Sequence, residues 1–358
     1  MDARRLRAEF PVLERLAFLN AGTDGPVAAA SVAAATTELE RQVARGRTRE
    51  HADRRREMQA AQRAAYADLL GCRPADVALT TSTTDAVHRA VGGLGLRAGD
   101  DVLTSDEEHP GLLGPLQAAR DLLGVAVRQV PLGDLPDAVT PATRLIACSH
   151  VSWITGAVAP AALADAGVPV LLDGAQAVGA VPVAVGSLGC ELYAASGQKW
   201  LCGPDGSGML YVSPAMRDRL GATARSYGSF GDPGAGLEAT LFPDARRHDT
   251  PTLAAETSAF ALAGLETLAR AGWPAVHERA RRLADDLAGR LRREGRAVCP
   301  RGSTTLVSWR CDDAEAARDR LARAGVVVRD IPGRPLLRAS VGAWNEESDL
   351  DRLLDALA

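Results

Sequence analysis

The chain has 358 residues, enough for a large and a small domain, with the 46% apolar and 24% charged residues of an ordinary globular enzyme. Its net charge of −4 offers no basic field for nucleic acid, and no apolar run of about 18 residues could span a membrane. Its six cysteines are widely spaced, which argues against a zinc site or a disulfide framework. We therefore expect a cytoplasmic protein with no bound metal and no nucleic-acid or membrane partner.

Helices and strands alternate along most of the chain. Two helices come first, from Pro26 to Gly46 and from His51 to Leu70. Short β-branched segments then alternate with helical ones. Seven strands are predicted at 77–80, 101–104, 125–130, 144–149, 168–173, 191–196 and 208–213, with helices at 84–94 and 111–123. This pattern predicts an α/β fold with a mostly parallel seven-stranded sheet, in which ligands bind beyond the carboxyl ends of the strands.

A Gly/Pro-rich segment at 226–244 marks a break or a lid after the last of these strands. The remaining elements are predicted as helices at 252–270 and 274–293, a strand at 304–310, a helix at 313–324, strands at 326–330 and 336–341, and a final helix. They indicate a small C-terminal α/β domain. We divide the chain into an N-terminal segment (1–20), a large domain (21–245) and a small domain (246–358).

Lys199 is the only lysine in the chain, beside 40 arginines. A composition that replaces lysine by arginine wherever charge alone matters suggests that this lysine does something arginine cannot do. An amine with a shiftable pKa can act as a nucleophile or form a Schiff base, whereas a guanidinium cannot. The alternative is that one lysine remained by chance.

Three further features follow predicted strands, and each has a simpler alternative. Asp173 ends a buried strand and would pair with a protonated ring nitrogen or cap a helix. Residues 82–84 (Ser-Thr-Thr) precede a helix, as in a phosphate cradle or an ordinary N-cap. His109 would stack on an aromatic ring or lie on the surface. A nucleotide-binding protein is disfavoured because neither G-x-x-x-x-G-K-[ST] nor a G-x-G-x-x-G after a strand is present.

These features occur in one order: the Ser/Thr turn, Glu-His after the next strand, S-H-V-S-W, D-G-A-Q, then S-G-Q-K-W-L-C-G-P. In this order and over about residues 17–357, the chain resembles the class V aminotransferases, which are fold-type-I pyridoxal phosphate (PLP) enzymes. The resemblance implies PLP as cofactor and a large domain with a smaller C-terminal one. It also implies an amino-acid substrate that reacts at Cα through an external aldimine and a quinonoid.

The resemblance assigns a role to each matching residue. Lys199 would bind PLP and move the Cα proton, Asp173 would pair with the ring nitrogen, and His109 would stack on the ring. The remaining cofactor contacts would be Ser82, Thr83, Thr84, Trp153, Gln176, Ser196 and Gln198, with Thr252 reaching the phosphate of a partner subunit in a homodimer. Substrate contacts would be Asn20, Gly22 and Arg338, the last on the α-carboxylate. Arg47 would contact a second anionic group of the substrate or cap a helix.

Several reactions remain open. We favour an aminotransferase or a β-lyase, with an epimerase of the isopenicillin N epimerase type as an alternative. A cysteine desulfurase is disfavoured because the loop before the carboxylate-binding arginine, residues 326–338, has no cysteine. A non-catalytic scaffold with this fold is the alternative from another class, and the intact Lys199–Asp173 pair argues against it.

Overall fold

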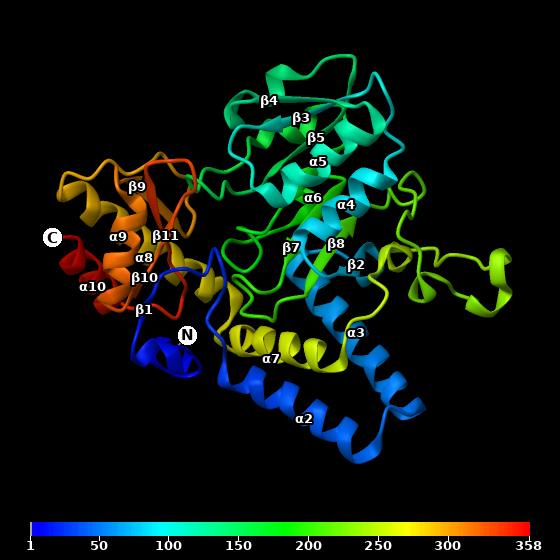
Figure 1. Ribbon diagram of the computed structural model, residues 1–358, viewed down its shortest axis with the longest axis horizontal. Coiled ribbons are helices and arrows are strands. Elements are labelled where there is room, and N and C mark those ends of the chain that lie inside the picture. Colours follow the sequence, from blue (N-terminus) through cyan, green and yellow to red (C-terminus); the bar gives the residue numbers. More distant parts are fainter. Residues whose placement is uncertain (1) are drawn as a thin grey trace.

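The computed structural model describes residues 2–358, and its centre is a seven-stranded sheet (Figure 1). The strand order is β2-β8-β7-β6-β5-β3-β4, and only β8 runs antiparallel to its neighbours. The strands are β2 (Val77–Thr80), β3 (Asp101–Ser105), β4 (Ala126–Val130), β5 (Thr143–Ser149), β6 (Val170–Asp173), β7 (Leu192–Ser196) and β8 (Gly208–Val212). The predicted fold, a mostly parallel seven-stranded sheet in an α/β protein, is confirmed.

Both faces of this sheet are covered, because successive strand residues point to opposite sides. Leu172 packs in a core on the side of α3 (Arg49–Leu70), whereas its neighbour Leu171 packs in a second core on the side of α4 (Thr83–Gly93) and α5 (Pro110–Leu123). All four residues of β6 are buried. A strand buried on both faces explains why Asp173, at its end, lies inside the protein.

Helix α2 (Ala29–Arg45) lies against α7 (Ala255–Ala271), below the sheet in Figure 1. The predicted start of α2 at Pro26 is wrong by three residues. The amide of Gly25 donates to the carbonyl of Gln198 (2.7 Å), and Ala28 is extended with ψ 140°. The helix therefore begins only beyond these residues, at Ala29. This extended stretch brings residues 22–25 alongside the loop that carries Lys199.

The C-terminal elements form a second unit with its own small sheets. An antiparallel sheet has the order β11-β12-β9, and β10 pairs in parallel with β1 from the N-terminal segment. The predicted strand 326–330 is therefore split between two sheets. The elements are β1 (Ala17–Phe18), α8 (Trp273–Arg293), β9 (Leu306–Arg310), α9 (Ala314–Arg323), β10 (Val326–Val327), β11 (Arg329–Asp330), β12 (Leu336–Ser340) and α10 (Glu347–Leu357); α1 (Ala3–Ala8) and α6 (Val185–Leu188) are short helices elsewhere in the chain.

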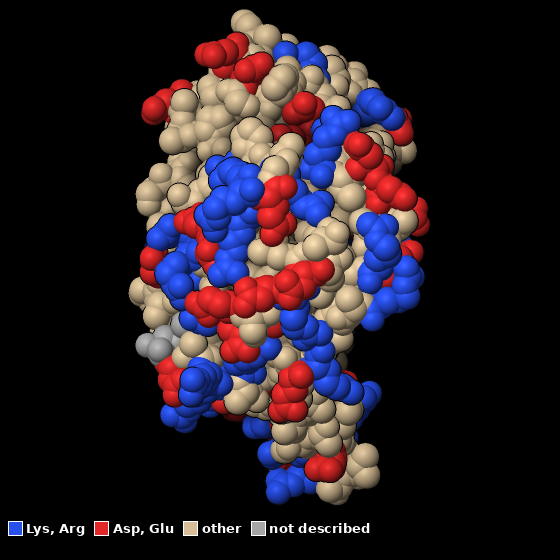
Figure 2. All heavy atoms as spheres, turned by 90° about the vertical axis from the view of Figure 1, so that its left-hand side faces the viewer, with Lys and Arg blue, Asp and Glu red and all other residues tan. Residues whose placement is uncertain are grey.

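The predicted break at 226–244 contains short 3-10 turns and projects from the body on the side away from the C-terminal unit (Figure 1). Its Leu237 side chain is fully exposed. On the face that includes the C-terminal unit, acidic and basic side chains are interspersed rather than separated into fields of one sign (Figure 2). No helix within residues 2–358 has both the length and the apolar character needed to cross a bilayer.

Candidate active site

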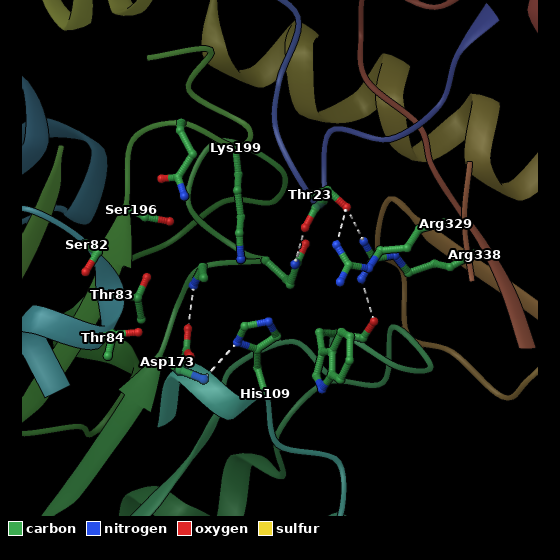
Figure 3. A pocket seen from close by; sticks show the side chains of 16 residues that line it. Thr23, Ser82, Thr83, Thr84, His109, Asp173, Ser196, Lys199, Arg329 and Arg338 are labelled. Carbon is green, nitrogen blue, oxygen red and sulfur yellow. Dashed lines mark hydrogen bonds between the residues drawn. The ribbon is translucent and has the colours of Figure 1, made fainter. Parts of the chain in front are cut away.

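A cavity of about 200 Å³ lies at the carboxyl ends of the central strands (Figure 3). The loops after β2, β3, β5, β6 and β7 all contribute to its wall, as expected for a parallel sheet. Twelve residues singled out in the sequence line it: Gly22, Ser82, Thr83, Thr84, His109, Trp153, Asp173, Gln176, Ser196, Gln198, Lys199 and Arg338. Four more were not anticipated: Thr23, Gly111, Ala175 and Arg329.

One end of the cavity is formed by the N-terminus of α4. The hydroxyl of Ser82 accepts a hydrogen bond from the amide of Asp85 (3.1 Å) and so caps the helix. Thr83 Oγ1 and Ser196 Oγ are buried and have no hydrogen-bond partner within residues 2–358. Buried hydroxyls without partners cost free energy unless a ligand satisfies them, and a helix N-terminus favours an anion. This end therefore fits a phosphate group.

Lys199 enters the cavity from the loop after β7. Burial and the nearby Arg338 lower the pKa of its amine to about 8, against the opposing effect of Asp173. The loop closes on itself through the amide of Cys202, which donates to the Lys199 carbonyl (3.1 Å). That carbonyl also lies where a Cβ on Gly25 would be, so the two segments can approach only because residue 25 is glycine.

Asp173 lies at the end of β6 and is 5% exposed. Its Oδ1 accepts a hydrogen bond from the amide of Ala175 (2.8 Å). Burial raises the pKa of this carboxyl, while the charge of Lys199 and the hydrogen bond from Ala175 lower it. Within residues 2–358 this carboxylate has no other hydrogen bond, and a buried carboxylate with so few partners is suited to a cationic group of a ligand.

His109 and Trp153 form a second wall, and Figure 3 shows Lys199 and His109 entering the cavity from opposite sides of the view. The rings of His109 and Trp153 meet edge to face, with centroids 4.9 Å apart and planes at 86°. Nδ1 of His109 accepts from the amide of Gly111 (2.9 Å), which leaves the proton of the neutral ring on Nε2. Burial and the charge of Lys199 lower the pKa of His109 to about 4, so the imidazole is neutral near pH 7.

Arg338 on β12 is 1% exposed at the other end of the cavity. Its Nη1 donates to the carbonyl of Trp153 (2.7 Å). Burial and the neighbouring Arg329 lower its pKa to about 9. The backbone of Gly22 lies close by, where a Cβ would come within 3.0 Å of Arg338 Nη2, so a larger residue would narrow the cavity.

Gln176 and Asn20 are held by neighbours from the N-terminal segment and the Lys199 loop. Gln176 lines the cavity and donates to the carbonyl of Gly22 (2.7 Å), while its Oε1 accepts from Trp200 Nε1 (3.1 Å). Asn20 does not line the cavity, but its Oδ1 accepts from the Thr23 hydroxyl (2.8 Å), so it orients a residue that does. Their predicted contacts with cofactor and substrate stay predictions.

Two predicted residues lie away from the cavity of their own chain. Arg47 is exposed after the C-terminus of α2, and its Nε donates to Gln42 Oε1 (2.8 Å). Arg47 therefore does not reach the cavity of its own chain, and its predicted contact with a second anionic group of the substrate stays a prediction. Thr252 is also exposed and does not line the cavity, which leaves it available to a second subunit.

Thr23 and Arg329 were missed by the sequence analysis, although a signal for Arg329 was present. Residues 331–335 (Ile-Pro-Gly-Arg-Pro) favour a tight turn, and Gly333 adopts φ 72° there. A hairpin around this turn places residue 329 opposite 338. Thr23 had no comparable signal, because only the contact of residues 22–25 with the Lys199 loop brings it to the cavity.

None of the six cysteines lines the cavity. Cys148, Cys190 and Cys202 are buried, and burial raises the pKa of each thiol, that of Cys190 to about 12. Within residues 2–358 no group of three or more His, Cys, Asp or Glu side chains is arranged to hold a metal ion. The cavity therefore has an amine nucleophile but no thiol.

The residues present fit PLP by their chemistry. The unpartnered hydroxyls of Thr83 and Ser196 at a helix N-terminus match its phosphate, and the buried Asp173 carboxylate matches a protonated pyridine nitrogen. An amine of lowered pKa, Lys199, lies between them and Arg338, all in one cavity (Figure 3).

Comparison with known proteins agrees with this arrangement. The sequence profile of the family described as Aminotransferase class-V matches residues 20–353. The chain belongs to the class V aminotransferase family. Both the predicted family and its cofactor, PLP, are confirmed, because members of this family depend on PLP.

The known proteins that are similar to this chain have several different activities. Isopenicillin N epimerase of Streptomyces clavuligerus is 30% identical over 82% of this chain and 82% of its own. A probable cysteine desulfurase of Pseudomonas aeruginosa is 30% identical over 79% of this chain and 78% of its own. A solved structure of the cystine C–S lyase C-DES, in complex with its reaction product cysteine persulfide, superposes with a TM-score of 0.92 at 25% identity, covering 97% of this chain and 98% of that one. A C-DES variant with glycine covalently linked to its PLP cofactor gives the same TM-score at 26% identity over 98% of both chains.

Proposed function

We propose that this PLP-dependent enzyme acts at the Cα of an α-amino acid and catalyses β-elimination of a leaving group from Cβ. The observation that carries the proposal is the combination, in one cavity, of a single amine base, a buried arginine and no thiol. In the overall reaction, an amino acid with a β-substituent X and one water give pyruvate, ammonium and HX. The reaction needs one base to remove the Cα proton and a route for the departure of X.

PLP, when bound, withdraws electrons from Cα and so makes the bonds to this carbon easier to break. The chain's own residues would bind, orient and move a proton. Thr83, Ser196 and the N-terminus of α4 hold the phosphate, and Asp173 keeps a proton on the ring nitrogen by charge. Arg338 holds the α-carboxylate at the far end of the cavity, and the Lys199 amine takes the Cα proton.

Epimerisation is less well supported because it needs a second proton donor opposite the first. His109 lies on the side away from Lys199 in Figure 3, and the ring of Trp153 contacts it edge to face. His109 is neutral near pH 7, and a neutral imidazole is a poor acid. A persulfide-forming desulfurase reaction is unsupported because no cysteine lines the cavity. In β-elimination, by contrast, X leaves on its own, which agrees with a C–S lyase among the structural relatives.

A homodimer is part of the proposal. Val32, Leu39 and Val43 are exposed along α2, spaced at helical intervals, and would form an apolar face for a second subunit. The exposed Thr252 would then complete the phosphate site of the partner. Two such sites per dimer follow from the symmetry.

The test is to incubate the holoenzyme with a panel of β-substituted L-amino acids and identify the products by mass spectrometry. Pyruvate and ammonium in equal amounts are expected. Conversion of the cofactor to its pyridoxamine form with release of the oxo acid would instead establish transamination. Loss of optical purity without either product would establish epimerisation.

A further inference from the structure

Arg329 and Arg338 lie directly opposite each other in the small antiparallel sheet. The register of β11 and β12 pairs Arg329 with Arg338 and Asp330 with Leu337. Both arginines of this pair line the cavity, where Figure 3 shows their guanidinium groups close together. Like charges directly opposite on one face of a sheet destabilise it. The pair therefore needs a compensating anion.

No carboxylate within the described residues contacts this pair, and the exposed Asp24 acts on Arg329 only from a longer distance. Within residues 2–358 neither Arg329 nor Arg338 forms an ion pair, and the adjacent Asp330 pairs with Arg318 instead (2.6 Å). Arg338 is 1% exposed, and its Nε has no hydrogen-bond partner in this part of the chain. A buried, unpaired guanidinium is costly unless a ligand neutralises it.

Neutral groups hold the two arginines in place. The hydroxyl of Thr23 lies between them, 3.1 Å from Arg329 Nη1 and 3.5 Å from Arg338 Nη2. Trp153 contacts both: its carbonyl accepts from Arg338 Nη1, and its ring lies 6.0 Å below the Arg329 guanidinium. These contacts orient the side chains without cancelling their charge, as in a preformed anion site.

Charge counting separates the roles of the two arginines. The phosphate would be held at the N-terminus of α4, and Asp173 lies near Lys199. The exposed Asp24 acts on Lys199 as well as on Arg329, so neither it nor Asp173 is committed to the arginine pair. One α-carboxylate neutralises one guanidinium. Arg338 is the deeper of the two, while Arg329 is half-buried and reaches solvent. A second anionic group would meet Arg329 on the side of the opening.

We infer that the natural substrate carries a second anionic group on its β-substituent and that Arg329 binds it. The substrate class is an α-amino acid whose leaving group contains a carboxylate or another oxyanion. This inference rests on the proposed β-elimination for the identity of the leaving group. It assigns to Arg329 the selectivity for a second anion that the sequence had suggested for Arg47.

A matched pair of substrates tests selectivity in turnover. O-succinyl-L-serine and O-acetyl-L-serine lose similar leaving groups, but only the first carries a side-chain carboxylate. We expect kcat/KM of the holoenzyme to favour the succinyl ester at least about tenfold, and Arg329→Gln to lower this ratio by about tenfold. Arg329→Lys should retain part of it. Arg310→Gln, an exposed arginine on β9, should leave the ratio as in the wild type.

A binding measurement tests the second anion site independently of turnover. Calorimetry of the holoenzyme with glutarate and butyrate compares two carboxylates with one. We expect glutarate to bind at least about tenfold more tightly, and Arg329→Gln to reduce that preference by a similar factor. In the unmodified enzyme, added salt should weaken glutarate binding more steeply than butyrate binding, because two charge pairs are screened instead of one.

The outcomes separate this inference from the proposed reaction. A glutarate preference that disappears in Arg329→Gln, without elimination from either ester, would refute the proposed reaction and retain the second anion site. Equal losses for glutarate and butyrate in Arg329→Gln would mean that both arginines bind one carboxylate, which overturns the inference. Equal salt dependence for the two acids would overturn it without any variant.

Discussion

Glu108 and Ser149 join the ends of two neighbouring strands behind the cavity. The backbone amide (2.9 Å) and the hydroxyl (2.6 Å) of Ser149 both donate to Glu108 Oε2, and the Ser105 hydroxyl donates to Oε1. Ser149 is the direct neighbour of Asp173 across the β5–β6 pair. Burial nevertheless raises the pKa of Glu108 to about 7, because these hydrogen bonds offset only part of the desolvation.

This carboxyl should make stability depend on pH. The pKa of Glu108 is higher in the folded chain than its ordinary value of 4.5, so the folded state binds more protons between about pH 4.5 and 7. The contribution of Glu108 to the free energy of unfolding is complete below pH 4.5 and is lost as pH rises through about 7. We expect the free energy of unfolding in urea to lose about 1–3 kcal/mol from this group across that range. Glu108→Gln should remove this loss.

Glu266→Gln, on the exposed surface of α7, provides the matched control and should keep the wild-type slope. Equal slopes for Glu108→Gln and wild type between pH 5 and 8 would show that Glu108 does not titrate there.

Lys199 should be the residue that holds PLP. Borohydride treatment of the holoenzyme should fix the cofactor to the one peptide that contains Lys199, as found by mass spectrometry. Lys199→Arg keeps the charge but should abolish turnover, since a guanidinium does not react with the cofactor aldehyde near neutral pH. Cofactor found only on the N-terminal amine would contradict the assignment.

Asp173→Ala should leave the protein folded but slow removal of the Cα proton by several orders of magnitude, because the protonated ring nitrogen loses its counter-charge. Deuterium exchange at Cα of a bound amino acid, followed by NMR, measures this step directly. The cofactor should also be held more weakly, which equilibrium dialysis detects. Near-normal exchange in the variant would mean that Asp173 acts only as a cap for the amide of Ala175.

The proposed dimer has composite sites, which subunit mixing can test. Chains with Lys199→Ala and chains with Thr252→Ala should each be impaired alone. A heterodimer would contain one site with both residues intact, so a random mixture should recover about a quarter of wild-type activity. Mixing Lys199→Ala with Lys199→Arg chains should recover none. A fully active monomer by light scattering would rule the arrangement out.

No cysteine should carry a persulfide after incubation with L-cysteine. The thiolate, not the thiol, attacks sulfur, and burial raises the pKa of Cys72 to about 12, as it does that of Cys190. A variant with all six cysteines replaced by serine or alanine should retain turnover if it folds. Cys202 is the sensitive position, because it is buried with φ 53° in the Lys199 loop. A persulfide mapped to any of the six would restore the desulfurase alternative.

The sequence by itself determined the sheet and the cofactor end of the site. Within residues 77–212 each strand is followed directly in the chain by the loop that reaches the cavity. The hydrophobic pattern of the strands was therefore enough to place Thr83, Asp173 and Lys199 at strand ends. The one lysine in an arginine-rich chain marked the reactive amine independently of the fold.

Only the tertiary structure decided the substrate end. The arginine pair depends on the register of β11 and β12, and Thr23 reaches the pair because residues 22–25 pack against the Lys199 loop. Arg47 shows the opposite case: the family resemblance suggested a substrate contact or a helix cap, and the structure leaves it exposed, outside the cavity of its own chain. Contacts between segments some 300 residues apart, such as Thr23 with Arg329, arise from packing and strand register, and these leave little trace in local sequence pattern.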